Sequence, residues 1–385
     1  MKARLILFVK ENKVIYFIYY LCMTLFLSIL KLFVRIDKKL ILFVENGGKF
    51  YSESPRVLYE GMLKDPKYDS FKLVWAFREP SKFPQVKNTI KIDTISYYIT
   101  ALKAKCWITN VAIERGLKFK PKGTYYFHTT HTTLPKVMGN DAKNAKNFTG
   151  FGTSKFDCSC ACSEYEAILQ QSMFGLSKNN IIISGYPKVD DLAKVSTDEM
   201  IKLRKQLCLP LDKKILLYAP TFREGTSSIN EMPIDINKWE RILGLDYILL
   251  FRAHPSLADK LNIEKNNTFV YNVSTYPDNT ELMKIADVLI SDYSGIFFEY
   301  AALKRPMYCY AYDYEQYIQK RPLYFDIRKE LPGGLMDEQK LLDLIKSPTD
   351  EVYRQLEQFR NKYVTSFGHA TLMCLDRIYE EINQR

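Results

Sequence analysis

The sequence lacks the short motifs that mark several large classes of nucleotide-binding protein. It has no G-x-x-x-x-G-K-[ST] segment, which excludes a P-loop nucleoside triphosphatase. It has no D-x-D pair, with which metal-dependent nucleotide-sugar enzymes often hold a cation. The near match at residues 150–152 (GFG) lacks the third glycine of a dinucleotide-binding turn and is therefore a weak signal. Low-complexity segments and repeats of solenoid period are also absent.

Cysteine is present, but without the spacing of a metal site. None of the eight cysteines forms a CxxC pair. Cys158, Cys160 and Cys162 alternate along the chain, so they are expected on one face of a strand, where small buried cysteines are common. We therefore favour a core role for them over a metal or cluster site. Nothing in the pattern requires disulfides, which fits a reducing compartment.

Histidine is scarce, and two of the four histidines, His128 and His131, lie in the segment FHTTHTTLPK. Neither has a Cys, Asp or Glu at ligand spacing, so we expect no zinc site. On a strand end, residues three apart point to opposite faces of the sheet. One ring is therefore expected inside the fold and the other at a cleft. We assign His131 to the cleft because Thr132, Thr133 and Lys136 follow it.

Acidic residues are too few to balance the basic ones, and the formal net charge is +11. Such an excess suits an anionic partner, which can be a membrane surface, a nucleotide or a phosphate polymer. A basic soluble protein without such a partner is the alternative that charge alone leaves open.

Residues 14–30 (VIYFIYYLCMTLFLSIL) contain no charged side chain, and lysines and arginines flank them on both sides. This run is at the short limit for crossing a bilayer, which usually takes about 20 residues. Tyr16, Tyr19 and Tyr20 suit the headgroup region. Three structures are compatible with the run: an interfacial helix, a short transmembrane helix, or a helix buried in the fold. We favour attachment to the membrane surface, because the basic flanks add attraction to anionic lipid.

From residue 40 onward, short apolar runs alternate with helical patterns, which is typical of a parallel sheet with helices on its faces. The first series of predicted strands covers residues 41–44, 72–77, 106–109, 125–129 and 181–184. A second series covers residues 215–219, 247–251, 269–272, 288–291 and 307–310. We predict an α/β protein with a membrane-associating helical segment (1–39), a first Rossmann-like domain (40–195) and a second one (196–385) that ends in a long helix from about Asp350.

Polar residues follow three strands of the second series, where ligands bind in open parallel sheets. Thr221 and Arg223 follow the first of these strands, and Arg252 and His254 follow the next. The third leads through Ser291 and Asp292 to Ser294 and Gly295 at a predicted helix start. Amides at a helix start and arginines both bind phosphate oxygens, so together these residues predict a diphosphate site. Each of them alone also has an ordinary explanation, such as a helix cap, an ion pair or a loop histidine.

The same segments carry a resemblance to a known family. They are SGYPK (184–188) with Asp190, YAPTFR (218–223), RAHP (252–255) and SDYSG (291–295), together with FVENGGKFYSESPRVLY (43–59). In these segments the chain resembles the CDP-glycerol glycerophosphotransferases, which build teichoic acids and related phosphate-linked polymers. The resemblance covers nearly everything after residue 39, and several of its motifs occur in the family's order and spacing.

The resemblance implies a glycosyltransferase B fold, in which two Rossmann-like domains face a cleft and the second domain holds the CDP of the donor. It also implies a peripheral membrane protein on the cytoplasmic face, with a lipid-linked saccharide acceptor and no nucleic-acid partner. Transfer of a polyol phosphate to an acceptor hydroxyl would then release CMP. Basic side chains can replace a metal in such a reaction, so we expect no required cofactor and a weak metal dependence at most.

The resemblance implies roles for named residues. His131 is expected to be the general base for the acceptor hydroxyl, and His254 to stabilise or protonate the diphosphate. Glu299 is expected to bind a ribose hydroxyl, while Lys136 and Thr132 lie on the acceptor side. The diphosphate would be held by Thr221, Arg223, Arg252, Ser291, Asp292, Ser294 and Gly295.

The segment HTTLPK (131–136) departs from the family's usual HGTPLK. Threonine replaces a glycine, so the acceptor loop is expected to differ in shape. A nucleotide-sugar glycosyltransferase of the same fold is the alternative enzyme, and a membrane-bound scaffold that binds the donor without turnover is the non-enzymatic alternative. The residues do not distinguish a glycerol from a ribitol donor. The absence of an additional N-terminal domain favours a priming or short-extension role.

Overall fold

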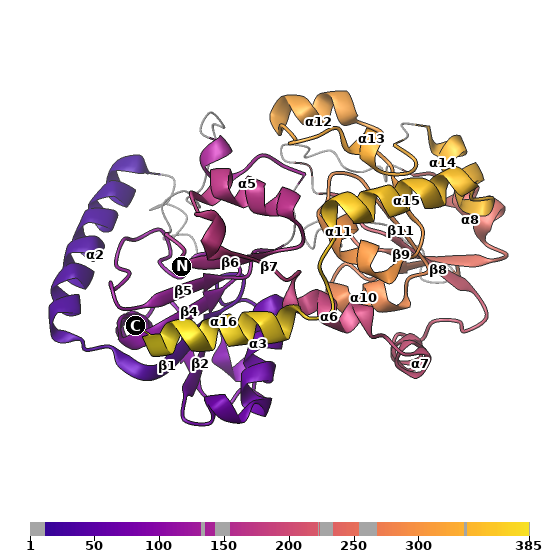
Figure 1. The fold of residues 1–385 in the computed structure, drawn as a ribbon. Coiled ribbons are helices and arrows are strands. Elements are labelled where there is room, and N and C mark those ends of the chain that lie inside the picture. The colour runs from indigo at the N-terminus through magenta and orange to yellow at the C-terminus, as the bar shows by residue number, and fades with distance from the viewer. Residues whose placement is uncertain are drawn as a thin grey trace.

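The computed structural model of the protein describes residues 12–131, 135–142, 155–221, 223, 234–253, 268–334 and 337–384. It is an α/β structure with two parallel sheets and helices on their faces (Figure 1). His254 and Thr132, both assigned to the site from the sequence, lie outside the described residues.

The first sheet has the strand order β3-β2-β1-β4-β5-β6-β7, and all its neighbouring strands are parallel. Its strands are β1 (Asp37–Val44), β2 (Lys72–Phe77), β3 (Thr89–Lys91), β4 (Ala104–Thr109), β5 (Tyr125–His128), β6 (Cys158–Ala161) and β7 (Ile181–Ile183). The order reverses between β1 and β4, and the carboxyl ends of strands at such a reversal are where ligands bind in open sheets.

The second sheet has the order β10-β9-β8-β11-β12 and is also parallel throughout. Its strands are β8 (Lys214–Tyr218), β9 (Tyr247–Phe251), β10 (Val270–Asn272), β11 (Val288–Ser291) and β12 (Met307–Cys309). Here the reversal lies between β8 and β11. The ten strands predicted from apolar runs are all confirmed to within four residues at each end. β3 was not predicted, and β6 was expected only from the alternating cysteines.

Helices pack on both sheets. Those up to the second sheet are α2 (Lys13–Phe33), α3 (Glu53–Lys64), α4 (Ile95–Lys103), α5 (Glu164–Phe174), α6 (Pro187–Ala193) and α7 (Thr197–Gln206). The later ones are α8 (Ile236–Leu243), α10 (Asn279–Ile285), α11 (Ile296–Tyr300), α12 (Tyr314–Lys320), α13 (Ile327–Glu330), α14 (Glu338–Lys346), α15 (Asp350–Tyr363) and α16 (Ala370–Gln384).

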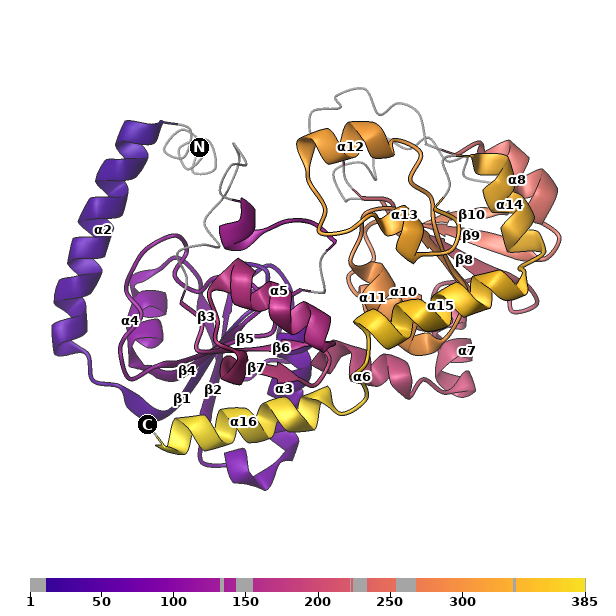
Figure 2. The ribbon, with the colours of Figure 1, turned by 45° about the horizontal axis from the view of Figure 1, so that its top comes forward.

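The expectation of one long final helix is wrong. The chain forms α15 and α16, and the segment between them contains Gly368 with a φ of +86°, a left-handed conformation that interrupts a helix. After this break α16 returns to the first sheet and lies against α3 and α6 (Figures 1 and 2). There the hydroxyl of Tyr68 donates to the carbonyl of Leu375 at 2.6 Å. The C-terminal helix thus ties the end of the chain to the first sheet.

The alternating cysteines are core residues, as the spacing predicted. Cys158, Cys160 and Cys162 are buried together in one hydrophobic core, whereas Ala161 faces a second core on the other side of the sheet. All three thiols are free. Burial raises the pKa of Cys158 to about 11, so this thiol is protonated and unreactive at neutral pH.

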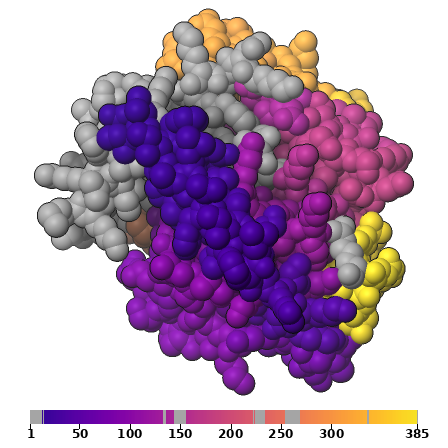
Figure 3. All heavy atoms as spheres, turned by 90° about the vertical axis from the view of Figure 1, so that its left-hand side faces the viewer, coloured from indigo at the N-terminus to yellow at the C-terminus, as the bar shows by residue number. Residues whose placement is uncertain are grey.

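Helix α2 lies on the outside of the first sheet. One stripe of it, with Tyr20, Met23, Leu27 and Leu30, packs against the core under α4. The remaining side chains are turned outward, and only 6% of its apolar window is buried (Figure 3). The alternative that this segment is a helix buried in the fold is therefore wrong. Among the described helices, α2 is the one whose length and composition would allow it to cross a membrane.

Candidate functional site

Lys188, at the start of α6, joins segments that belong to the two sheets. Its ammonium group lies 2.5 Å from a carboxylate oxygen of Glu53 and 2.9 Å from one of Glu299. It also donates to the backbone carbonyl of His131 at 2.5 Å. Glu53 begins α3 beside the first sheet and Glu299 lies in α11 beside the second. The lysine side chain is only 4% exposed, so these contacts are shielded from water.

The charges of this cluster are mutually dependent. Burial lowers the pKa of Lys188, but the carboxylates of Glu299 and Glu53 outweigh that effect and hold the pKa above its ordinary value. Burial would raise the pKa of Glu53, yet Lys188, His131 and Arg252 bring it below its ordinary value. Both groups are therefore ionised at neutral pH, and the ion pair holds the histidine loop in place.

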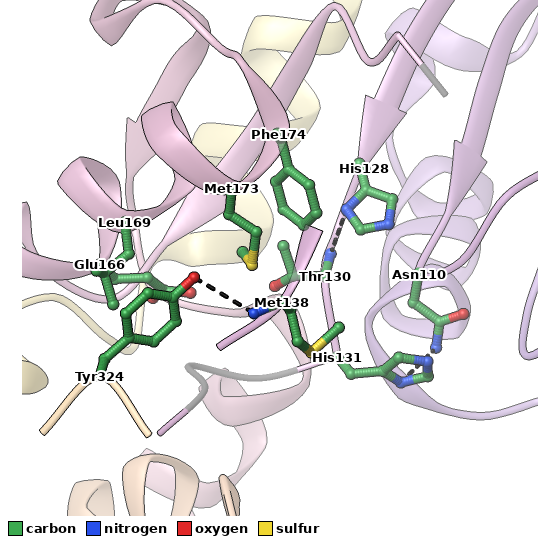
Figure 4. Close-up of a pocket in the computed structure, with 10 residues that line it drawn as sticks. All are labelled: Asn110, His128, Thr130, His131, Met138, Glu166, Leu169, Met173, Phe174 and Tyr324. Atoms are coloured by element: carbon green, nitrogen blue, oxygen red, sulfur yellow. Dashed lines mark hydrogen bonds between the residues drawn. The ribbon is translucent and has the colours of Figure 1, made fainter. Parts of the chain in front are cut away.

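A second group of residues lies where the strand order of the first sheet reverses. Glu45 follows β1 and Asn110 follows β4, and the carboxamide nitrogen of Asn110 lies 3.4 Å from the Glu45 carboxyl. The same nitrogen lies 3.3 Å from Nδ1 of His131, beyond the end of β5 (Figure 4). Burial, and next the charge of Glu53, raise the pKa of Glu45 to about 8. This carboxyl group is thus largely protonated at neutral pH.

The two histidines face different surroundings, as their spacing predicted. His128 is buried, its ring stacks on Phe156 at 4.0 Å between centroids, and burial lowers its pKa to about 3. His131 is half-buried beside Asn110. Burial, and also the charge of Lys188, lower its pKa, while Glu53 acts in the opposite direction. Both rings are therefore neutral near pH 7.

Backbone strain occurs in these segments, as it also does at Asp93, Arg115, Cys208 and Lys304 elsewhere in the described chain. Asn46, Glu53 and Thr130 have φ values of 42°, 61° and 54°, a backbone region that residues other than glycine rarely adopt. The conformation is costly for Thr130 in particular, because its side chain is β-branched. Asn46 follows β1 and bonds to Asn110, Glu53 begins α3, and Thr130 directly precedes His131. The strained backbone therefore lies beside residues of the site.

A pocket opens beside His131. Its walls are mostly apolar, and the residues that line it are Asn110, His128, Thr130, His131, Met138, Glu166, Leu169, Met173, Phe174 and Tyr324 (Figure 4). The hydroxyl of Thr130 is buried here without a hydrogen-bond partner among the described residues. The pocket therefore presents mainly apolar surface beside Asn110 and His131.

The segment that carries Lys136 is bound to a segment near the second sheet. Lys136 and Leu323 form an antiparallel bridge, and the amide of Tyr324 donates to the carbonyl of Pro135 at 2.7 Å. The Tyr324 hydroxyl accepts from the amide of Met138 and donates to Asp141 at 2.7 Å. Tyr324 thereby closes one side of the pocket and fixes the loop after His131.

At the second sheet, Arg223 is held by carboxylates. It makes a two-pronged contact with Asp313, at 2.7 and 2.9 Å, and lies 2.8 Å from Asp292. Asp292 also accepts from the amide of Thr221 at 2.9 Å. The structure thus brings Thr221, Arg223 and Asp292 together, and the guanidinium group is already bound within the protein. Its contact with a diphosphate remains a prediction.

Arg252 is held differently. Its guanidinium donates to the carbonyls of Val273 and Tyr276, at 3.1 and 2.8 Å, and it forms no ion pair with a carboxylate among the described residues. Burial lowers its pKa, while Asp278 and Glu53 act in the opposite direction. An arginine remains charged despite such a shift. Arg252 is therefore a fixed positive charge at the carboxyl end of β9, close enough to Glu53 to affect its pKa and suited to an anionic ligand.

The turn after β11 is compact. Ser291 donates from its hydroxyl to the carbonyl of Ala219 at 2.5 Å, and the Ser294 hydroxyl accepts from the amide of Ile296 at 3.3 Å. Gly295 precedes α11, which has only five residues. Gly295 is the N-cap residue of that helix and no side chain caps it, so Ser294 bonds to the first helical amide without being the cap. Within the described ranges, no group of three His, Cys, Asp or Glu side chains is placed to hold a metal ion.

Sequence reasoning missed five residues of the site: Glu45, Glu53, Asn110, Thr130 and Lys188. Glu45 and Asn110 directly follow buried strands, so the rule that was applied to the second sheet would have found them in the first. Glu53 and Lys188 lie in segments that carried the resemblance. Their pairing joins residues 135 positions apart, which only the tertiary structure shows.

Comparisons with known proteins agree with this architecture. Residues 26–379 match the model of a family described as CDP-Glycerol:Poly(glycerophosphate) glycerophosphotransferase. A teichoic acid poly(glycerol phosphate) polymerase of Staphylococcus epidermidis is 31% identical over 380 residues, which cover 91% of this chain and 52% of the polymerase. The chain therefore spans about half the length of that relative. A teichoic acid glycerol-phosphate transferase of Staphylococcus aureus is 30% identical, with 85% of this chain and 86% of the transferase covered.

Solved structures of a similar protein have the same fold. The structure of the wall teichoic acid polymerase TagF superposes with a TM-score of 0.81 and 30% identity, and covers 91% of this chain and 90% of that one. A structure of a TagF variant with CDPG also gives a TM-score of 0.81, with 29% identity and the same coverage.

Proposed function

Because the chain belongs to the CDP-glycerol:poly(glycerophosphate) glycerophosphotransferase family, we propose that it transfers a polyol phosphate from a CDP-linked donor to an acceptor hydroxyl and releases CMP. Glycerol phosphate is the proposed group, in the synthesis of teichoic acid or a related cell-surface polymer. The donor assignment is supported by the family description and by the presence of CDPG in a TagF structure. We propose a lipid-linked saccharide as the acceptor.

The observation that carries the proposal is the position of Lys188. This lysine connects Glu53 and the His131 loop, at the carboxyl ends of the first sheet, with Glu299 beside the second sheet. Arg252 acts electrostatically on Glu53, so its positive charge lies on the same side. In the proposed arrangement the two sheets belong to two domains of glycosyltransferase B type, with the donor diphosphate near Arg252 and the acceptor near His131.

In the proposed reaction, the acceptor oxygen bonds to the distal phosphorus of the donor, and the bond from that phosphorus to the bridging oxygen breaks. CMP leaves with that oxygen. The transition state spreads negative charge over the phosphoryl oxygens, so fixed positive charges and hydrogen-bond donors lower its energy. Arg252 supplies such a charge, and His254 is proposed to act on the diphosphate. His131 is the histidine proposed to contact the acceptor hydroxyl.

Membrane attachment is part of the proposal. Helix α2 turns large apolar side chains outward, among them Phe17, Leu21 and Leu25 at exposures of 58, 49 and 64%. Packing of the opposite stripe against the first sheet suits a helix that lies along a membrane surface, on the cytoplasmic side where nucleotide donors are available. A lipid-linked acceptor would then reach the site from the same surface.

A binding screen and a turnover assay test the function together. CDP-glycerol, CDP-ribitol, UDP-sugars and GDP-sugars are compared by thermal shift, and radiolabelled CDP-glycerol is incubated with a lipid-linked disaccharide acceptor. Stabilisation by a CDP-polyol, together with label transfer that falls about 10²–10⁴-fold in His131→Ala and His254→Ala, is the expected result. Stabilisation by UDP- or GDP-sugars alone would contradict it. Donor binding without turnover at any acceptor would favour a scaffold.

A further inference from the structure

The side-chain amide of Asn110 can have only one orientation. Its Oδ1 accepts a hydrogen bond from the backbone N–H of Asn46 at 3.0 Å. A backbone N–H is always a donor, so the amide nitrogen cannot occupy that position. Nδ2 therefore faces the other way, where its two hydrogens have two partners: Oε1 of Glu45 at 3.4 Å and Nδ1 of His131 at 3.3 Å.

This orientation determines which ring nitrogen of His131 carries the proton. Nδ1 faces an N–H donor, so it must be the acceptor, and the proton of the neutral ring is then on Nε2. Protonation of Nδ1 would set two N–H groups against each other. No hydrogen bond of Nε2 is present among the described residues.

We propose that Asn110 is a positioning residue that holds His131 as its Nε2–H tautomer, so that His131 donates a hydrogen bond to the reacting phosphoryl or acceptor oxygen instead of removing a proton. This inference rests on the proposed function and replaces the general-base role expected from the sequence. A base at this position would need the lone pair on Nε2 and a proton on Nδ1, and Asn110 offers no acceptor for such a proton.

The backbone and the neighbouring charges support the same state. Lys188 holds the carbonyl of His131 at 2.5 Å, which fixes the loop from which the ring projects. The titratable groups around the ring are Glu45 at the end of β1, Glu53 on α3, His128 on β5, Glu166 on α5 and Lys188 on α6. Lys188 and Glu53 oppose each other in their effect on His131, and burial adds to the effect of Lys188. The balance keeps the ring neutral.

The reaction remains balanced without a histidine base. The acceptor oxygen forms its bond to phosphorus as the bridging bond breaks, and His131 keeps its proton throughout. The hydroxyl proton ends on the phosphate of the departing CMP, since a phosphate monoester has a second pKa of about 6. Phosphoryl transfer through a loose transition state depends mainly on positioning and charge stabilisation, so late loss of this proton is compatible with catalysis.

Histidine ring nitrogens give a direct test that needs no activity. In protein labelled with ¹⁵N-histidine, the His131 signals are assigned by their loss in His131→Gln. At pH 7 we expect the proton on Nε2 alone in the intact protein. In Asn110→Asp we expect Nδ1 to be protonated, with Nε2 also protonated in the fraction of molecules whose ring is charged, because an aspartate at this position accepts where the asparagine donates. A proton on Nδ1 in the unaltered protein would overturn the proposal whether or not the chain is a transferase.

The pH profile of Asn110→Asp separates the two roles of His131. The aspartate raises the pKa of the ring, and only the protonated ring then carries Nε2–H. A donor role predicts that turnover of CDP-glycerol falls as the pH rises from 6 to 9, at least tenfold relative to the unaltered protein at the high end. A base role predicts that turnover rises over the same range, which would refute the proposal.

Two controls keep these outcomes distinct from failure of the proposed function. Asn88→Asp makes the same change at a half-buried asparagine directly before β3 that bonds to the carbonyl of Leu73, and it should leave the shape of the pH profile unchanged. CDP-glycerol binding by calorimetry is measured for the unaltered protein and for Asn110→Asp. Similar affinities show that the donor site is intact. Absence of binding and turnover in the unaltered protein would count against the proposed function and leave the ring nitrogen assignment standing.

Discussion

Lys188 and Glu299 form a buried ion pair, with 2.9 Å between their charged atoms and side-chain exposures of 4 and 6%. The pair connects the start of α6 with α11, and Glu53 completes it from the side of the first sheet. Buried charges are costly unless each has its partner, so this cluster fixes how the segments around the site lie relative to one another.

Removal of the lysine charge is expected to destabilise the fold. Lys188→Met leaves the buried carboxylate of Glu299 and the half-buried carboxylate of Glu53 without a cation, at a cost of about 3–5 kcal/mol. The free energy of unfolding from urea titration measures the effect. Lys178→Met is the matched control, since its pair with Glu164 is exposed and is worth about 1 kcal/mol at most. Equal losses in the two variants would contradict the importance of the buried cluster.

The raised pKa of Glu45 predicts that the stability of the protein falls as the pH rises. Burial raises its pKa in the folded protein to about 8 from an ordinary value of 4.5, so between these values the folded state binds more protons than the unfolded state. Stability contributed by Glu45 is therefore full below pH 4.5 and is lost as the pH rises to about 8, with a slope that approaches about 1.4 kcal/mol per pH unit.

Glu45→Gln should abolish this contribution, because the amide stays neutral at every pH. Unfolding free energies of the two proteins should therefore diverge steadily in favour of the variant between pH 5 and 8. Glu357→Gln, on the exposed face of α15, serves as the control and should run parallel to the unaltered protein. A constant difference between Glu45→Gln and the unaltered protein would show that Glu45 is ionised when folded.

Substitution of two arginines at the second sheet is expected to affect different properties, ligand binding for one and stability for the other. Arg252 is held by backbone carbonyls, so Arg252→Ala should keep the fold but weaken CDP-glycerol binding about 10–100-fold, the equivalent of one charged hydrogen bond. Arg223→Met removes the cation between Asp292 and Asp313 and should lower the unfolding free energy by about 3–5 kcal/mol. Calorimetry and thermal unfolding distinguish the two effects. Unchanged affinity in Arg252→Ala would remove Arg252 from the donor site.

Attachment through α2 can be measured with vesicles. Replacement of Phe17, Leu21 and Leu25 by serine removes apolar area from the outward face without touching the stripe packed on the first sheet. Flotation with vesicles that contain anionic lipid should fall at least tenfold, because each buried large apolar side chain contributes about 1.5–3 kcal/mol. Leu245→Ser, at a residue 92% exposed beside the second sheet, should have no effect. Equal flotation of all three proteins would exclude α2 as the anchor.

Several site residues beside the first sheet were missed although they directly follow strands that were predicted correctly. The strand before Asn110 was expected at residues 106–109, yet nothing in the sequence showed that β4 pairs with β1 and brings Asn110 beside Glu45. The general-base role of His131 followed from its residue type and its position in a motif. The proposed tautomer of His131 depends on the side-chain amide of Asn110. The orientation of that amide is set by the backbone N–H of Asn46, which lies 64 residues before Asn110.

By itself, the sequence determined the parallel α/β architecture, most strand positions, the core role of the alternating cysteines and the family. All of these depend on local periodicity or on short motifs, which one segment carries alone. The tertiary structure decided the packing of α16 on α3, the Glu53–Lys188–Glu299 cluster and the contact between the Asn110 amide and Nδ1 of His131. Each of these depends on the burial of groups that are distant along the chain, and the cost of burying an unpartnered charge or N–H is incurred only when the segments meet.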